Sequence, residues 1–112
     1  MEPPAKGSKA MLKHIVFWKL KPEAQGAPAS ENGEAVKRLL EGLKPLIPEI
    51  LELEVGFQIR PSADQPDLAL YSRFKDEAAL EAYQRHPEHL KVKDFIGKVV
   101  ASRHTVDYLM GP

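Results

Sequence analysis

Alternating apolar and polar residues mark several segments of this chain as β-strands. Within residues 50–60, from Leu51 onward, apolar side chains occupy every odd position, and glutamate, glycine, glutamine and arginine occupy the even ones. This period of two is typical of a strand with one buried face. Residues 11–20 and 67–74 are rich in β-branched, aromatic and leucine side chains, and residues 99–110 form a comparable last segment. We therefore predict four strands.

The first strand is apolar on both of its faces. Its even positions hold Leu12, His14, Val16, Trp18 and Leu20. Ile15 and Phe17 lie on the opposite face. Because a strand that is apolar on both sides is usually covered on both sides, we expect a helix layer on one face and a partner subunit on the other.

Helical spacing of apolar residues predicts a first helix between the first two strands. Its apolar positions are Val36, Leu39, Leu40, Leu43 and Ile47. Ser30 or Asn32 is the expected N-cap, since both side chains can accept a backbone hydrogen bond. Pro45 and Pro48 are expected to end this helix, because proline removes a backbone donor and restricts the residue before it.

A second helical region follows the third strand and is interrupted near its middle. Asp76 is its expected N-cap, and the His86-Pro87 pair breaks the helix. Pro87 suits the first position of a new helical segment, which His86 can cap and which is expected to end at Gly97.

The element order is strand, helix, strand, strand, helix, strand, which is the ferredoxin-like βαββαβ pattern of α+β proteins. It predicts a four-stranded antiparallel sheet with helices on one face, formed by residues 11–110. Residues 1–10, with two prolines, a glycine and small polar residues, are predicted to be a disordered lead. The apolar second face of the sheet predicts a homodimer in which two sheets pack face to face.

Composition narrows the function classes. The 112 residues suit one domain. The 16 basic and 16 acidic residues leave zero net charge, which argues against a nucleic-acid partner. No cysteine is present, so disulfides, a thiolate nucleophile and a cysteine metal cage are excluded. The chain has no signal-peptide pattern, no apolar run long enough for a membrane partner and no phosphate-binding glycine motif, so we expect a cytoplasmic protein without a cofactor.

The densest polar cluster lies at residues 83–89, where the helix breaks. His89 titrates near neutral pH and is the candidate general base. Tyr83 is the candidate hydrogen-bond donor to a carbonyl or enolate oxygen. The candidate substrate-binding residues are His14, Val16, Trp18 and His86, since a pocket commonly combines apolar walls with a few polar groups.

The same residues also suit structural roles. His86 and His89 can be capping or surface residues, Tyr83 and Trp18 core aromatics, and His14 and His104 satisfied histidines on a sheet. No metal site is predicted, because His86 and His89 have Glu88 beside them but no evident third ligand. A hard-cation site of carboxylates stays open, since it needs no fixed spacing.

Three stretches resemble the stress-responsive dimeric α+β barrel (Dabb) family. They are residues 13–22, Tyr83 followed by His86-Pro87-Glu88-His89, and Val106-Asp107-Tyr108. The resemblance covers residues 11–110 and implies a ferredoxin-like protomer whose sheet packs on its twin. The Tyr-x-x-His-Pro-x-His segment is similar to that of a plant branch of the olivetolic acid cyclase type, which closes a linear polyketide. That branch implies His89 as the base, Tyr83 as its helper and His14 in the pocket.

Two classes of function remain. The first is an enzyme that binds or transforms a small apolar carbonyl or polyketide-like compound in a pocket between sheet and helices. The second is a non-catalytic dimer with a stress-response or ligand-binding role. A weaker alternative, suggested by the fold alone, is an oxygenase-like dimeric barrel enzyme.

Overall fold

The computed structural model describes residues 10–111. The predicted lead at residues 1–10 lies, except for Ala10, outside the described residues. The elements in chain order are β1 (Met11–Leu20), β2 (Glu23–Ala24), β3 (Ala27–Pro28), α1 (Ala29–Glu41), β4 (Glu52–Phe57), β5 (Leu68–Phe74), α2 (Glu77–Arg85), α3 (Pro87–Val99) and β6 (Val100–Met110). In residues 10–111 no helix is long and apolar enough to span a bilayer.

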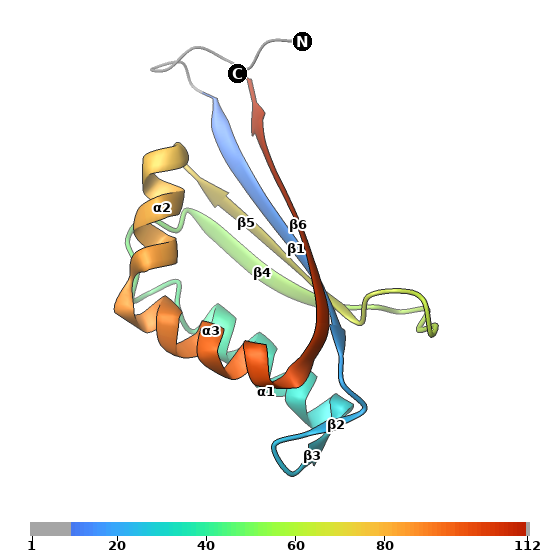
Figure 1. Cartoon of the computed structure of the whole chain (residues 1–112). Coiled ribbons are helices and arrows are strands. Elements are labelled where there is room, and N and C mark those ends of the chain that lie inside the picture. Colours follow the sequence, from blue (N-terminus) through green and yellow to red (C-terminus); the bar gives the residue numbers. More distant parts are fainter. Residues whose placement is uncertain (1–9, 112) are drawn as a thin grey trace.

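The main sheet has the strand order β4-β5-β1-β6, and every neighbouring pair is antiparallel. The three helices cover one face of this sheet and leave the other face open (Figure 1). The protein therefore has the predicted ferredoxin-like α+β fold. The short β2–β3 hairpin, which the sequence did not predict, lies between β1 and α1.

The core lies between the sheet and the helices. The even positions of β1 and the even positions of β5 are buried, and the odd positions of both strands are only partly covered. Val36 and Leu40 of α1 are almost fully buried against them. The two faces that the sequence distinguished in the first strand are thus the helix-covered face and the open face.

The predicted N-cap of α1 is wrong. The helix begins at Ala29, Pro28 is the N-cap, and no side chain caps it. Ser30 and Asn32 therefore lie within the first turn. The Asn32 side-chain amide instead donates to the carbonyl oxygens of Ala24 and Ala27, at 2.9 and 3.3 Å, and ties the β2–β3 hairpin to the helix.

Two predicted elements, the first helix and the second strand, are shorter in the structure than the sequence pattern indicated. Helix α1 ends at Glu41 with Gly42 as its C-cap, so Ile47 is buried in the connection to β4 and not in the helix. Strand β4 covers residues 52–57 and not 50–60, because β5 begins at Leu68, opposite Phe57. One more backbone hydrogen bond, from Gln58 N–H to the Asp67 carbonyl oxygen at 2.8 Å, follows that pair, and Ile59 beyond it is 88% exposed despite its place in the apolar pattern.

The interrupted helical region was predicted well. The Asp76 carboxylate accepts a hydrogen bond from the backbone N–H of Ala79 at 2.9 Å, so it is the N-cap of α2. His86 ends α2 and caps α3, and Pro87 is the first residue of α3. Helix α3 continues two residues past Gly97, to Val99.

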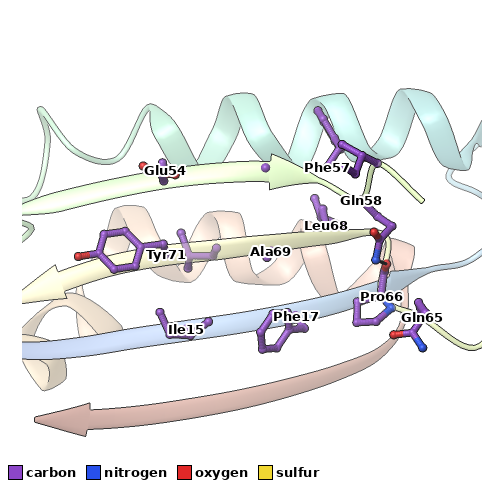
Figure 2. Close-up of a pocket in the computed structure, with 13 residues that line it drawn as sticks. Ile15, Phe17, Glu54, Phe57, Gln58, Gln65, Pro66, Leu68, Ala69 and Tyr71 are labelled. Carbon is purple, nitrogen blue, oxygen red and sulfur yellow. Dashed lines mark hydrogen bonds between the residues drawn. The ribbon is translucent and has the colours of Figure 1, made fainter. Parts of the chain in front are cut away.

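The open face of the sheet is apolar at its centre. Figure 2 shows Ile15, Phe17 and Tyr71 on the face opposite the helices, where they line an open hollow of about 620 Å³. At its border the Tyr71 hydroxyl accepts a hydrogen bond from Lys13 Nζ at 2.7 Å and donates one to Glu52 at 3.1 Å. An antiparallel sheet normally exposes a polar second face, so this face has the composition of a contact surface.

Candidate functional site

The break between α2 and α3 consists of one extended residue, His86. Its backbone N–H donates to the carbonyl oxygen of Tyr83 at 3.2 Å, and its Nδ1 atom accepts from the backbone N–H of Glu88 at 3.1 Å. Because these bonds satisfy groups at the end of one helix and at the start of the next, the chain turns sharply here. The turn brings the first turns of α3 back toward the end of α2.

His89 is oriented by that turn. Its Nδ1 atom lies 3.1 Å from the carbonyl oxygen of Gln84, in the last turn of α2. A carbonyl oxygen can only accept, so Nδ1 is the protonated nitrogen and Nε2 of the neutral ring has a free lone pair. Burial lowers the pKa of His89, and the nearby cations Lys93 and Arg103 lower it further, against the opposing effect of the Gln84 carbonyl. His89 is therefore an uncharged base at neutral pH.

Tyr83 is packed directly against this base. The centroids of the Tyr83 and His89 rings are 4.4 Å apart. Tyr83 is only 1% exposed, and burial raises the pKa of its phenol well above the usual range. Within residues 10–111 its hydroxyl has no hydrogen-bond partner. Tyr83 is thus a neutral and uncommitted hydrogen-bond donor.

His14 faces the same region from the sheet. It is 3% exposed, and its Nδ1 atom donates to the Asp107 carboxylate of β6 at 2.5 Å. Asp107 is its cross-strand neighbour, so the sheet register itself fixes this pair. The His14 ring packs edge-on against Tyr83, with centroids 6.2 Å apart. Tyr83 therefore lies between the two histidine rings.

A cavity of about 450 Å³ lies between the sheet and the helices at this point. The predicted site residues among its walls are His14, Val16, Trp18, Tyr83 and His89. The remaining walls include apolar side chains of α1, α3 and β5. The volume suits a small organic molecule, since such sites usually measure about 300–1,000 Å³. His86 is not among the lining residues; it caps α3, and its contact with a substrate stays a prediction.

Several residues of the site were missed by the sequence analysis. Gln84 orients His89, Asp107 orients His14, and Lys93 and Arg103 line the cavity. For Lys93 a signal existed, because it follows His89 by four residues and so shares its helix face. The other three depend on backbone geometry or strand register. Among residues 10–111, no group of three or more metal-ligating side chains could hold a metal ion.

The fold and the cavity define a class: a ferredoxin-like α+β protein whose helix layer and sheet enclose a site with two histidines and a tyrosine. The model of the stress responsive A/B barrel domain (Dabb) matches residues 12–110. The chain therefore belongs to this family.

Solved structures share the fold of this chain. A dimeric protein of unknown function with a ferredoxin-like fold, from Bacteroides fragilis, is 31% identical, with a TM-score of 0.78 over 89% of this chain and 96% of that one. A dimeric ferredoxin-like protein from Thermobifida fusca is 23% identical, with a TM-score of 0.77 over 98% and 100%. Hydroxynitrile lyase from Passiflora edulis is 22% identical, with a TM-score of 0.74 over 90% and 94%. Among curated protein sequences, none matches this chain.

Proposed function

We propose that this protein is a small enzyme that removes a proton from the carbon next to a carbonyl group of an apolar compound. His89 is the base and Tyr83 the hydrogen-bond donor. One observation supports this most directly: an uncharged histidine with a free Nε2 and an uncommitted phenol line the same cavity, with their rings 4.4 Å apart.

The chemistry requires both groups. The C–H bond breaks, its proton moves to Nε2 of His89, and the electron pair shifts onto the carbonyl oxygen. That oxygen becomes an enolate and accepts a hydrogen bond from Tyr83, which strengthens as negative charge develops. In a β-polyketone the enolate carbon can then attack a second carbonyl group of the same molecule, and the protonated His89 returns its proton to the new alkoxide. These steps are an intramolecular aldol addition. Loss of the new hydroxyl group together with a hydrogen from the adjacent carbon, as water, would complete the aldol condensation that the resemblance to cyclases of the olivetolic acid type implies.

The neighbours support an enzyme on this scaffold only in general terms. The Passiflora edulis protein is named a hydroxynitrile lyase, but at 22% identity it shares the fold and not an established reaction. A second candidate function, binding of a small apolar ligand without turnover, is favoured by the mainly apolar walls of the same cavity.

We also propose that the protein is a homodimer in which the open sheet faces pack together. The apolar centre of that face supports this assembly, as do the two neighbours described as dimeric. Its expected signature is a mass in solution near twice 12.5 kDa at micromolar concentration, measured by light scattering.

The test of the enzyme proposal is exchange of hydrogen for deuterium at the central carbon of acetylacetone and of longer β-polyketones, followed by NMR in D₂O. The wild-type protein should accelerate exchange, and His89→Gln should lose about 10²–10⁴-fold of that acceleration. His104→Gln is the matched control, since His104 lies opposite Phe17 on the other face of the sheet and does not line the cavity. Equal exchange by wild type and His89→Gln would rule the enzyme out, and binding without exchange would establish the ligand-binding alternative.

A further inference from the structure

The cavity beside His89 has two charged residues in its lining, and both are cations. Lys93 projects from α3 and Arg103 from β6. Within residues 10–111 neither has an ion pair or a hydrogen bond, whereas Lys91 and Lys98 of the same helix are paired with Glu88 and Asp94. A cavity with mainly apolar walls and two unpaired cationic side chains is suited to bind an anion.

A third donor lies in the same region. The indole Nε1 of Trp18 is fully buried and has no hydrogen-bond partner within residues 10–111, and Trp18 as a whole is 3% exposed. A buried donor left unpaired costs about 1–3 kcal/mol, and buried indole N–H groups usually find a partner. Trp18 lines the cavity and pairs across the sheet with Arg103. A bound acceptor would satisfy this N–H.

These donors lie on one side of the histidine pair, with Lys93 and Arg103 close enough to His89 to lower its pKa. Trp18 is four residues along β1 from His14, which at about 3.3 Å per residue places their Cα atoms roughly 13 Å apart. Lys93 is one helical turn past His89, and Arg103 precedes Asp107 by four residues on β6. The Asp107 carboxylate would repel an anion at the His14 end, so the charges give a bound molecule one orientation.

We propose that the cavity binds an oxo acid: a molecule whose carbonyl end reaches His89 and Tyr83 and whose carboxylate end is held by Arg103, Lys93 and the indole N–H of Trp18. The planar guanidinium can pair with a carboxylate through two parallel hydrogen bonds. The carbonyl half of this assignment rests on the proposed function, whereas the carboxylate half rests on the three uncommitted donors.

The experiment uses matched ligands. One series consists of acetylacetone derivatives in which one methyl group is extended by a saturated chain of varied length ending in a carboxylate. The other is the same series with a primary amide in place of the carboxylate. Isothermal titration should show the wild-type protein binding the best carboxylate about tenfold or more tightly than its amide. Added salt should reduce this preference, because screening weakens exposed charge pairs.

The variants assign the preference to its residues. Arg103→Gln and Lys93→Gln should each lower carboxylate affinity by about tenfold and leave amide affinity nearly unchanged. Trp18→Phe should weaken both ligands but reduce the carboxylate preference. Lys98→Gln, which removes a paired cation from the same helix, should bind as the wild type does. Equal wild-type affinity for acid and amide, or an unchanged preference in Arg103→Gln and Lys93→Gln together, would overturn the proposal.

The experiments distinguish failure of the proposed catalytic function from failure of the proposed carboxylate site. His89→Gln should keep the carboxylate preference, because His89 does not hold the anion. A preserved preference without any α-carbon exchange in the wild-type protein would support the carboxylate site and reject the catalytic role. If the protein accelerates exchange of acetylacetone but shows no carboxylate preference, that result would support the catalytic role and reject the carboxylate site.

Discussion

His89 on α3 donates its Nδ1 proton to the carbonyl oxygen of Gln84 on α2, across a helix break that is one residue long. The bond uses a carbonyl that the end of α2 would otherwise leave without an intrahelical partner. It also determines which nitrogen of the imidazole is available for chemistry. A local folding requirement and the orientation of the proposed base therefore depend on the same contact.

The first prediction concerns pH. Burial lowers the pKa of His89 below its ordinary value of 6.5, so the ring loses its proton at a lower pH than a free histidine. Because the neutral ring is the proposed base, kcat/KM for α-carbon exchange should rise with pH, reach half its maximum below 6.5 and be level at neutral pH. A pH profile of the exchange rate, with the uncatalysed rate subtracted, checks this. A midpoint above 6.5 would contradict it.

The second prediction separates stability from activity at Tyr83. The hydroxyl has no partner within residues 10–111, so Tyr83→Phe breaks no hydrogen bond and should change the free energy of unfolding by less than about 1 kcal/mol. Exchange should nevertheless fall by about 10²-fold, because the enolate oxygen loses its donor. Urea denaturation and exchange kinetics on the same preparation give both values. Full activity in Tyr83→Phe would remove Tyr83 from the mechanism.

Local signals explain why most of the fold was predictable. The β-branched and aromatic content of β1, the cap at Asp76 and the break at His86 each depend on residues that are neighbours along the chain. The failures involve contacts between distant segments. Ile59 continues the alternation of β4 but has no partner strand beside it, and Asn32 was given a capping role while its amide serves a hairpin.

The candidate site, too, was predictable where it depends on local patterns along the chain, and not where it depends on contacts between distant segments. Tyr83 and His89 lie within seven residues of one another, and the strand pattern placed His14 on the same face as Val16 and Trp18. The carboxylate that orients His14 was not predictable as its partner, because the pairing of His14 with Asp107 requires the register of β1 against β6. Arg103 was missed for the same reason, since only its position opposite Trp18 places it at the cavity.

The third prediction concerns that carboxylate. Asp107→Ala leaves the buried Nδ1–H of His14 without its acceptor and should destabilise the protein by about 1 kcal/mol, the lower part of the usual range, because water reaches the Asp107 side chain. Asp107→Asn keeps an oxygen that can accept and should cost less. Thermal unfolding of the two variants provides the comparison. An equal loss of stability in the two variants would show that the negative charge of Asp107, and not its hydrogen bond to His14, stabilises the protein.

The fourth prediction distinguishes two roles of His86. As the N-cap of α3, His86 should be replaceable by asparagine, whose side-chain oxygen can accept from the backbone N–H of Glu88. His86→Ala should lose about 1 kcal/mol of stability and should reduce exchange, because His89 is positioned by the turn that His86 caps. His86→Asn should restore both. If His86 contacts the substrate, His86→Asn would instead restore stability while ligand affinity, measured by titration, stays impaired.

The last prediction concerns the open face of the sheet. Val106 of β6 is 53% exposed in the single chain and lies beside Ile15 on that face, whereas Thr105 points to the helix side, opposite Val16. Val106→Glu would place a charge inside the proposed sheet-to-sheet contact, where burial without a partner is costly. It should therefore shift the protein toward monomer at micromolar concentration. Thr105→Glu adds the same charge to the same strand and should stay dimeric, and sedimentation velocity separates the two species. A dimer that tolerates Val106→Glu as well as it tolerates Thr105→Glu would mean that the copies associate through another surface.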